Sequence, residues 1–192
     1  MRKIFLILLS LLTLPSVATA AIIDFSVLPE NTPVTNQFAG LGVTFRGLEN
    51  GSEVPIVVAN FGSTTGDSYL SNCYPVRCAD RADIVEVSFL SAVDNVSFGV
   101  DSEGGLSITF NAFDAGGNLL ESFAASSNGG VFGFSADGIS RIDMLQPTES
   151  WGWGFANLTF DAAASSAVPP PATLVLVGLG LVGLGRSRRK NA

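Results

Sequence analysis

The chain has 192 residues, of which 47% are hydrophobic and 14% charged, and it contains no histidine. This composition excludes a disordered or fibrous chain, and the missing histidine excludes mechanisms that use imidazole as a base or metal ligand. All 17 acidic residues lie in the body of the chain, where four arginines oppose them, so the body has a net charge of −13 that disfavours nucleic-acid binding. These arginines are Arg46, Arg77, Arg81 and Arg141.

The N-terminus has the three parts of a secretory signal peptide. Residues 2–3 are basic, residues 4–14 form an apolar run too short to span a bilayer, and Ala18 and Ala20 make an A-x-A cleavage site. We therefore expect cleavage between Ala20 and Ala21, which places the mature chain in an oxidising, exported compartment. An uncleaved membrane anchor is the alternative.

The C-terminal part changes composition several times. A small-residue linker at residues 161–167 follows the domain that we expect at residues 21–160. Prolines then stiffen the start of the terminal segment, residues 168–192, into an extended conformation. Residues 172–185 carry no charge and predict a short transmembrane helix, which at 1.5 Å per residue spans about 21 Å of a bilayer core of about 30 Å. The basic tail at residues 186–190 would stay cytoplasmic.

The order of proline motif, apolar glycine-rich run and basic end resembles the PEP-CTERM sorting signal of Gram-negative bacteria. The resemblance implies an inner-membrane intermediate, removal of the tail by an exosortase, and release to the cell surface or extracellular matrix; the family is associated with exopolysaccharide. Pro170 stands where the family has glutamate, and a single-pass anchor is the alternative. The motif residues are Val168, Pro169, Pro170, Pro171, Ala172 and Thr173, and the basic ones are Arg186, Arg188, Arg189 and Lys190.

Between the two ends, apolar residues recur with a period of two, flanked by glycine-rich turns. This pattern predicts about ten short strands in an all-β, antiparallel β-sandwich, and it resembles the lectin-like jelly-roll domains that often precede such sorting signals. Further expected strands are at residues 21–27, 41–46, 54–60, 119–125, 131–135, 139–145 and 151–160. Clear alternation occurs in Val85-Val87-Phe89, Val96-Phe98-Val100 and Leu106-Ile108-Phe110.

The last expected strand changes parity. Trp151, Trp153 and Phe155 share one face, whereas Leu158 and Phe160 have the opposite parity. We therefore expect a bulge or break near residues 156–157, unless both faces of the strand are covered. The first and last strands should lie near one another, as they do in jelly rolls.

Two cysteines, Cys73 and Cys78, lie four residues apart in an exported chain. This context predicts a disulfide that closes a small ring, because the spacing is not that of a redox or zinc motif. The charged residues at 80–83 follow directly. They predict either a solvated turn with local ion pairs or the rim of a ligand site.

Three further kinds of site have a possible basis in the sequence, each beside a structural alternative. Calcium is the one cofactor that the sequence suggests. No EF-hand or RTX spacing is present, so its oxygen ligands would come from distant strands. The candidates are Asp24 and Asn157, joined by Asp101, Glu103 or Asp143. Aromatic side chains at 151, 153 and 155 predict core packing or a sugar-stacking platform. Paired carboxylates for glycoside hydrolysis have no distinguishing motif, so we predict no catalytic residue.

We therefore expect an exported, non-catalytic structural or adhesive protein associated with exopolysaccharide. The expected partners are an exosortase-like enzyme, extracellular polysaccharide and, through the C-terminal helix, the membrane. The alternatives are a secreted carboxylate-dependent glycan-active enzyme, a carbohydrate-binding module with structural calcium, and a filler with no specific ligand.

Overall fold

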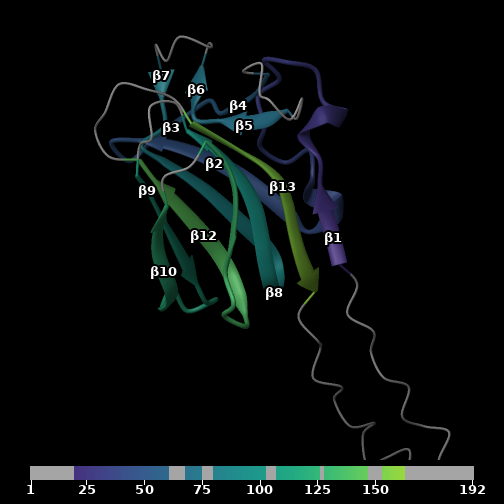
Figure 1. The fold of residues 1–192 in the computed structure, drawn as a ribbon, viewed down its shortest axis with the longest axis vertical. Helices are drawn as coiled ribbons and strands as arrows, with labels where there is room; N and C mark the ends of the chain where they lie inside the picture. Colours follow the sequence, from purple (N-terminus) through teal and green to yellow (C-terminus); the bar gives the residue numbers. More distant parts are fainter. Residues whose placement is uncertain are drawn as a thin grey trace, which may run out of the picture. The chain divides into compact units, whose positions relative to one another are not determined.

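Short antiparallel strands make up most of the structure, a computed structural model that describes residues 20–60, 68–74, 80–102, 107–125, 128–146 and 153–162 (Figure 1). Two 3-10 helices of one turn are the other elements of these residues. The elements are β1 (Ala20–Ile23), η1 (Phe25–Val27), η2 (Ala39–Leu41), β2 (Val43–Glu49), β3 (Ser52–Val54), β4 (Val57–Ala59), β5 (Tyr69–Ser71), β6 (Cys73–Tyr74), β7 (Asp80–Arg81), β8 (Ile84–Ser102), β9 (Ile108–Phe113), β10 (Leu119–Ala125), β11 (Asn128–Gly133), β12 (Ile139–Leu145) and β13 (Trp153–Ala162).

The first layer contains β3, β2, the first half of β8, β12, β9 and β10, in that spatial order. All of these pairs are antiparallel. β2 and β3 are joined by Asn50 and Gly51, both of which have positive φ, at 50° and 80°. Two consecutive residues of this conformation match the twist of a tight hairpin, and Asn-Gly is the dipeptide best suited to it.

The second layer is built around β13. The second half of β8 lies along one edge of β13 and carries β11 on its other side. The opposite edge of β13 pairs with β5, which continues to β4, and with β1. The pairing of β1 with β13 confirms the expected proximity of the first and last strands.

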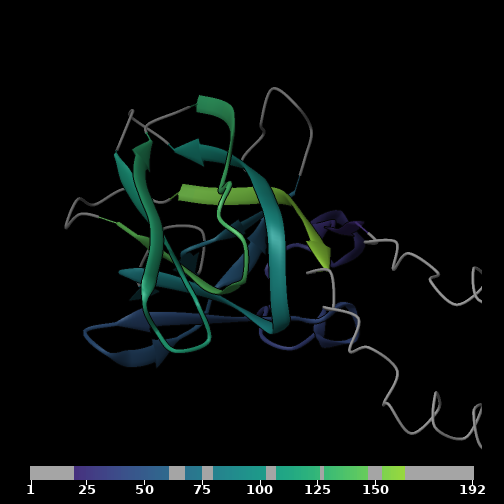
Figure 2. The ribbon, with the colours of Figure 1, turned by 90° about the horizontal axis from the view of Figure 1, so that it is seen from below.

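A single strand, β8, takes part in both layers. It has 19 residues and curves from one layer into the other (Figure 2). Asn95, with φ of 52°, lies where the register of β8 against β13 shifts. This bulge reverses the parity of the buried side chains, which are Val85, Val87 and Phe89 before it and Val96, Phe98 and Val100 after it. The two alternating runs seen in the sequence are therefore parts of one strand.

A second bulge in β13 confirms the predicted irregularity near residues 156–157. The register against β8 shifts between Ala156 and Thr159, and Asn157 has φ of 52°. Phe155 on one side and Leu158 on the other are both fully buried. The bulge thus keeps both apolar runs of β13 directed into the core.

Aromatic side chains from the two layers meet in this core. Ring centroids lie 5.0 Å apart for Phe98 and Phe110, and 6.1 Å apart for Phe45 and Phe155. Trp153 and Phe155 are 1% and 0% exposed. The alternative of a sugar-stacking platform is therefore wrong for these two residues, because no sugar can reach their ring faces; Trp151 lies outside the described residues.

Candidate functional site

Five polar side chains cross the outward face of the first layer at one level. The strand registers align Arg46 with Glu86, Glu86 with Asp143, Asp143 with Asn111, and Asn111 with Ser122. These five strand positions alternate with core residues, so the side chains all point away from the core. We call this set the polar row. A second level runs beside it through Ser88, Arg141 and Phe113.

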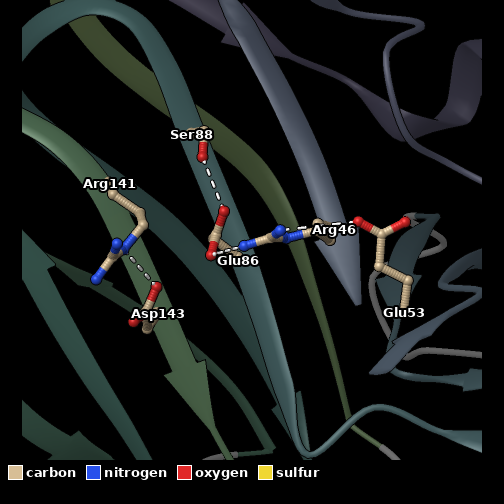
Figure 3. A network of polar contacts seen from close by, with 6 residues as sticks. All are labelled: Arg46, Glu53, Glu86, Ser88, Arg141 and Asp143. Carbon is tan, nitrogen blue, oxygen red and sulfur yellow. Dashed lines mark hydrogen bonds and ion pairs between the residues drawn. The ribbon is translucent and has the colours of Figure 1, made fainter. Parts of the chain in front are cut away.

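Ion pairs and hydrogen bonds fix the β2–β8 end of the polar row (Figure 3). Arg46 Nη2 donates to Glu86 Oε2 at 2.7 Å, and Ser88 Oγ donates to Glu86 Oε1 at 3.1 Å. The Glu86 side chain is only 14% exposed. Its hydrogen bond and charge raise the pKa of Arg46, so this guanidinium is held charged in one orientation.

The β12 part of the row contains a second, more buried ion pair. Arg141 Nε lies 3.0 Å from Asp143 Oδ1, and the Arg141 guanidinium lies 4.4 Å from the centre of the Phe113 ring. Burial raises the pKa of Asp143, the negative charge of Glu86 adds to this effect, and Arg141 opposes it. Two neighbouring carboxylates, Glu86 and Asp143, thus have different electrostatic environments.

A pocket of about 200 Å³ opens at the β2–β3 edge of this face. Val34, Phe45 and Ile56 are buried lining residues, whereas Thr35, Arg46 and Glu53 are exposed ones. Arg46 Nη1 lies 3.7 Å from Glu53 Oε1. We call this hollow the edge pocket; because it shares Arg46 with the polar row, the two form one continuous surface. Its complete lining is Pro33, Val34, Thr35, Phe45, Arg46, Gly47, Glu53, Val54, Pro55 and Ile56.

This surface offers both hydrogen-bond donors and hydrogen-bond acceptors. The guanidinium groups donate in plane, the carboxylates and the Asn111 amide accept, and the hydroxyls of Ser88 and Ser122 do both. Such a surface can bind a ligand rich in hydroxyl groups, and Phe113 adds an apolar contact beside it.

The predicted calcium ligands are engaged separately. Asp24 caps η1 by accepting from the Ser26 backbone N–H at 2.8 Å, and hydrogen bonds from Ser26 lower the pKa of Asp24. Asn157 lies in the β13 bulge, next to the end of β1 in register. Asp143 pairs with Arg141. Within the described part of the chain no three His, Cys, Asp or Glu side chains form a metal-binding group, and Glu103 lies outside it.

The charged residues after the second cysteine have structural contacts. Asp80 and Arg81 form β7, which pairs with β6, and Arg81 Nη2 lies 3.5 Å from Asp83 Oδ1. Asp83 Oδ2 accepts from the backbone N–H of Asn50 at 3.1 Å, so it ties down the β2–β3 turn. The local ion pair predicted for this segment is thus present. Cys73 is buried and is not a free thiol, whereas Cys78 lies outside the described residues, so their pairing stays a prediction.

A buried asparagine joins this segment to the sheets. Asn72 is fully buried and its Nδ2 donates to the Ala82 carbonyl at 3.1 Å and to Gln146 Oε1. Its Oδ1 accepts from the Trp153 backbone N–H at 3.0 Å. The amide therefore satisfies polar groups from three separate segments, a role that composition alone did not indicate.

The structure describes the predicted export and sorting residues only where the terminal segments adjoin the domain. Ala20 and Ala21 belong to β1, so the predicted cleavage site lies at the start of the first strand. Ala18, the motif at residues 168–173 and the basic tail at residues 186–190 lie outside the described residues, as does the predicted transmembrane helix. Among the described residues, no helix is long and apolar enough to cross a membrane.

Comparison with known proteins identifies no family. No family model matches the chain, and no curated protein does. Among solved structures, the chain is similar to a mutant of CBM29-2, a family 29 carbohydrate-binding module, complexed with mannohexaose. The two chains are 15% identical with a TM-score of 0.44, and the match covers 81% of this chain and 100% of that chain. CBM29_1, a family 29 carbohydrate-binding module from Piromyces equi, has 12% identity, a TM-score of 0.42, and coverage of 80% and 97%. An arabinose-bound α-L-arabinofuranosidase, MgGH51, has 12% identity, a TM-score of 0.40, and coverage of 70% and 25%. These TM-scores are too low to assign a family or a function to this chain.

Proposed function

We propose that this protein is an exported, non-catalytic module that binds extracellular polysaccharide through the polar row and contributes to a cell-surface or extracellular matrix. The observation that carries the proposal is the row itself: donors and acceptors held at one level across five strands. Arg46 of the row and Arg141 of the level beside it are already paired with carboxylates of the row, so a ligand finds these groups oriented before it binds. The acidic body disfavours the competing class of nucleic-acid ligands.

The export and sorting parts of the proposal rest on the two ends. A signal peptide cleaved before Ala21 delivers the chain across the inner membrane, where the apolar run at residues 172–185 holds it. An exosortase-like enzyme then reads the motif at residues 168–173 and releases the protein. In the exported compartment Cys73 and Cys78 form a local disulfide.

Polysaccharide binding is tested with the full chain and matrix polysaccharide from the producing cells, in calcium and then in chelator. Arg141→Ala and Phe113→Ala should each weaken retention several-fold, because they remove a donor and the adjacent apolar contact. Arg81→Gln is the matched control, since Arg81 is another ion-paired arginine that lies outside the polar row. Equal retention of all the variants would refute the surface formed by the polar row and the level beside it as the binding surface. No retention of the wild-type chain would refute polysaccharide binding.

Sorting is tested separately by terminal peptide mass spectrometry of surface protein. Pro170→Glu restores the acid of the family motif and should raise the processed fraction. Surface protein that keeps its terminus at Ala192 would show that the tail is not a cleavage signal.

One observation favours a second candidate, a glycan-active enzyme. Glu86 and Asp143 are register partners on the outward face, and burial raises the pKa of Asp143, as expected of a general acid. Shortening of the polysaccharide by the wild-type chain but not by Glu86→Gln would establish this activity. Binding without shortening supports the non-catalytic function.

A further inference from the structure

Arg46 differs from the other arginines that the structure describes. Its side chain is 46% exposed, against 37% for Arg141 and 18% for Arg81. Glu86 holds it through Nη2 at 2.7 Å, whereas its Nη1 has only the longer contact of 3.7 Å with Glu53. Glu53 is 73% exposed, so this second contact is a weak, solvent-screened ion pair.

The guanidinium therefore has one strongly bound side and one weakly bound side. The weakly bound side belongs to the edge pocket, which both Arg46 and Glu53 line. An incoming carboxylate can replace the Glu53 carboxylate at Nη1 without disturbing the pair with Glu86. Planar guanidinium groups bind carboxylates with two aligned donors, and such charge-assisted hydrogen bonds are about twice as strong as neutral ones.

The size and lining of the edge pocket limit what can bring that carboxylate. Its volume of about 200 Å³ is below the roughly 300–1,000 Å³ of sites for drug-sized ligands, so it suits a single sugar unit. Pro33, Val54 and Pro55, which are exposed or half-buried, offer apolar contact to the ring carbons, and Thr35 lies among the exposed lining residues. One carboxylate contact at Arg46 differs from nucleic-acid binding, which needs several phosphate contacts, and charges of the body more than about 8 Å away are largely screened at physiological salt.

We propose that the edge pocket binds one carboxylate-bearing sugar unit, of the uronic acid class, with Arg46 Nη1 holding the sugar carboxylate in place of Glu53. This inference rests on the proposed polysaccharide-binding function and specifies the chemistry of its ligand. Glu53 then acts as an internal competitor that occupies Arg46 in the absence of ligand.

The test compares oligogalacturonate with its methyl ester, which keeps the sugar backbone and removes the charge. Calorimetric titration of the full chain should show about tenfold tighter binding of the free acid. Arg46→Ala should abolish this preference, and Glu53→Gln should strengthen binding of the acid about twofold to threefold, since it removes the competing carboxylate. Glu30→Gln, an exposed acid outside the edge pocket, is the matched control and should change nothing.

The outcomes separate the inference from the proposed function. Equal affinity for the acid and the ester, or an unchanged preference in Arg46→Ala, overturns the uronic acid pocket while polysaccharide binding stands. Failure of the wild-type chain to bind either probe or the matrix polysaccharide overturns both. Glu53→Gln keeps the test valid if Arg46→Ala does not fold, because a gain in affinity cannot come from misfolding.

Discussion

The two faces of the first layer are made by the same strands and have opposite roles. On β12, Ile142 is fully buried and its neighbour Asp143 belongs to the polar row; on β9, Phe110 and Asn111 are related in the same way. The inner face is packed against the second layer, so its residues are constrained by volume. The outer face is constrained by strand geometry and by polar contacts between its own side chains, and no second layer packs against it. Stability and binding should therefore be separable residue by residue.

The largest loss of stability is expected from a substitution on the inner face. Phe110 is fully buried, with ring centroids 5.0 Å from Phe98 and 5.2 Å from Phe123. Phe110→Ala should lower the free energy of unfolding by about 3–5 kcal/mol, because it leaves a cavity between the layers. Asn111→Ala, one residue along on the outer face, should cost about 0.5 kcal/mol or less. Equal losses in denaturant melts would contradict the separation of the faces.

Removal of a buried polar side chain should destabilise the fold, as removal of an inner-face side chain does. Asn72→Ala removes the partner of the Trp153 backbone N–H and of Gln146 Oε1, and leaves both in the interior. We expect a loss of about 2–3 kcal/mol in the free energy of unfolding, since unsatisfied buried groups cost about 1–3 kcal/mol each. The exposed Asn36→Ala is the control. A thermal melt in which the two variants coincide would show that the buried amide contributes nothing.

The β13 bulge keeps both apolar runs of that strand directed into the core, so its conformation is the next test. Asn157→Ala places a Cβ-bearing residue without a polar side chain at φ of 52° and should cost about 1 kcal/mol. Asn157→Gly should cost less than Asn157→Ala, because glycine adopts this conformation freely. The reverse order in thermal melts would mean that side-chain contacts of Asn157, and not its backbone, determine the stability of the bulge.

The smallest effect concerns pH. The pKa of Asp143 is raised above its ordinary value of 3.8, so the folded chain binds this proton more readily than the unfolded chain. Asp143 therefore lowers stability as pH rises above 3.8, and Asp143→Asn should remove that dependence. The pKa of Asp114 is lowered, so its contribution has the opposite sign: it is present above 3.8 and is lost as pH falls. If the melting temperatures of the Asp143→Asn and wild-type chains changed with pH in the same way above pH 3.8, this role of Asp143 would be contradicted.

Local patterns predicted the strands better than the site. The expected range 119–125 coincides with β10 and 139–145 with β12, because alternation and turn residues are local signals. The parity change in β13 was predictable for the same reason. The polar row was not, since its members come from five strands and their alignment depends on register, which a single sequence does not contain. Its only local signal is that Arg46, Glu86 and Asp143 occupy outward positions of alternating runs.

The length of β8 also escaped prediction. A polar Asp94-Asn95 step between two alternating runs is typical of a turn, and here it is a bulge within one strand. Glycine-rich turns elsewhere do end strands, as at Gly117, where φ is 79°. The difference is tertiary: β13 and β11 continue the pairing of β8 beyond Asn95, which outweighs the local preference for a turn.

The position of β13 determines the order in which the chain can assemble. β13 is the last described strand, yet it pairs with β1, with β5 and with the second half of β8. As the chain is synthesised from its N-terminus, those three strands remain without this common neighbour until residues 153–162 are made. Contacts between such distant segments form late and slowly. The second layer therefore remains incomplete until β13, the last described strand, has been made.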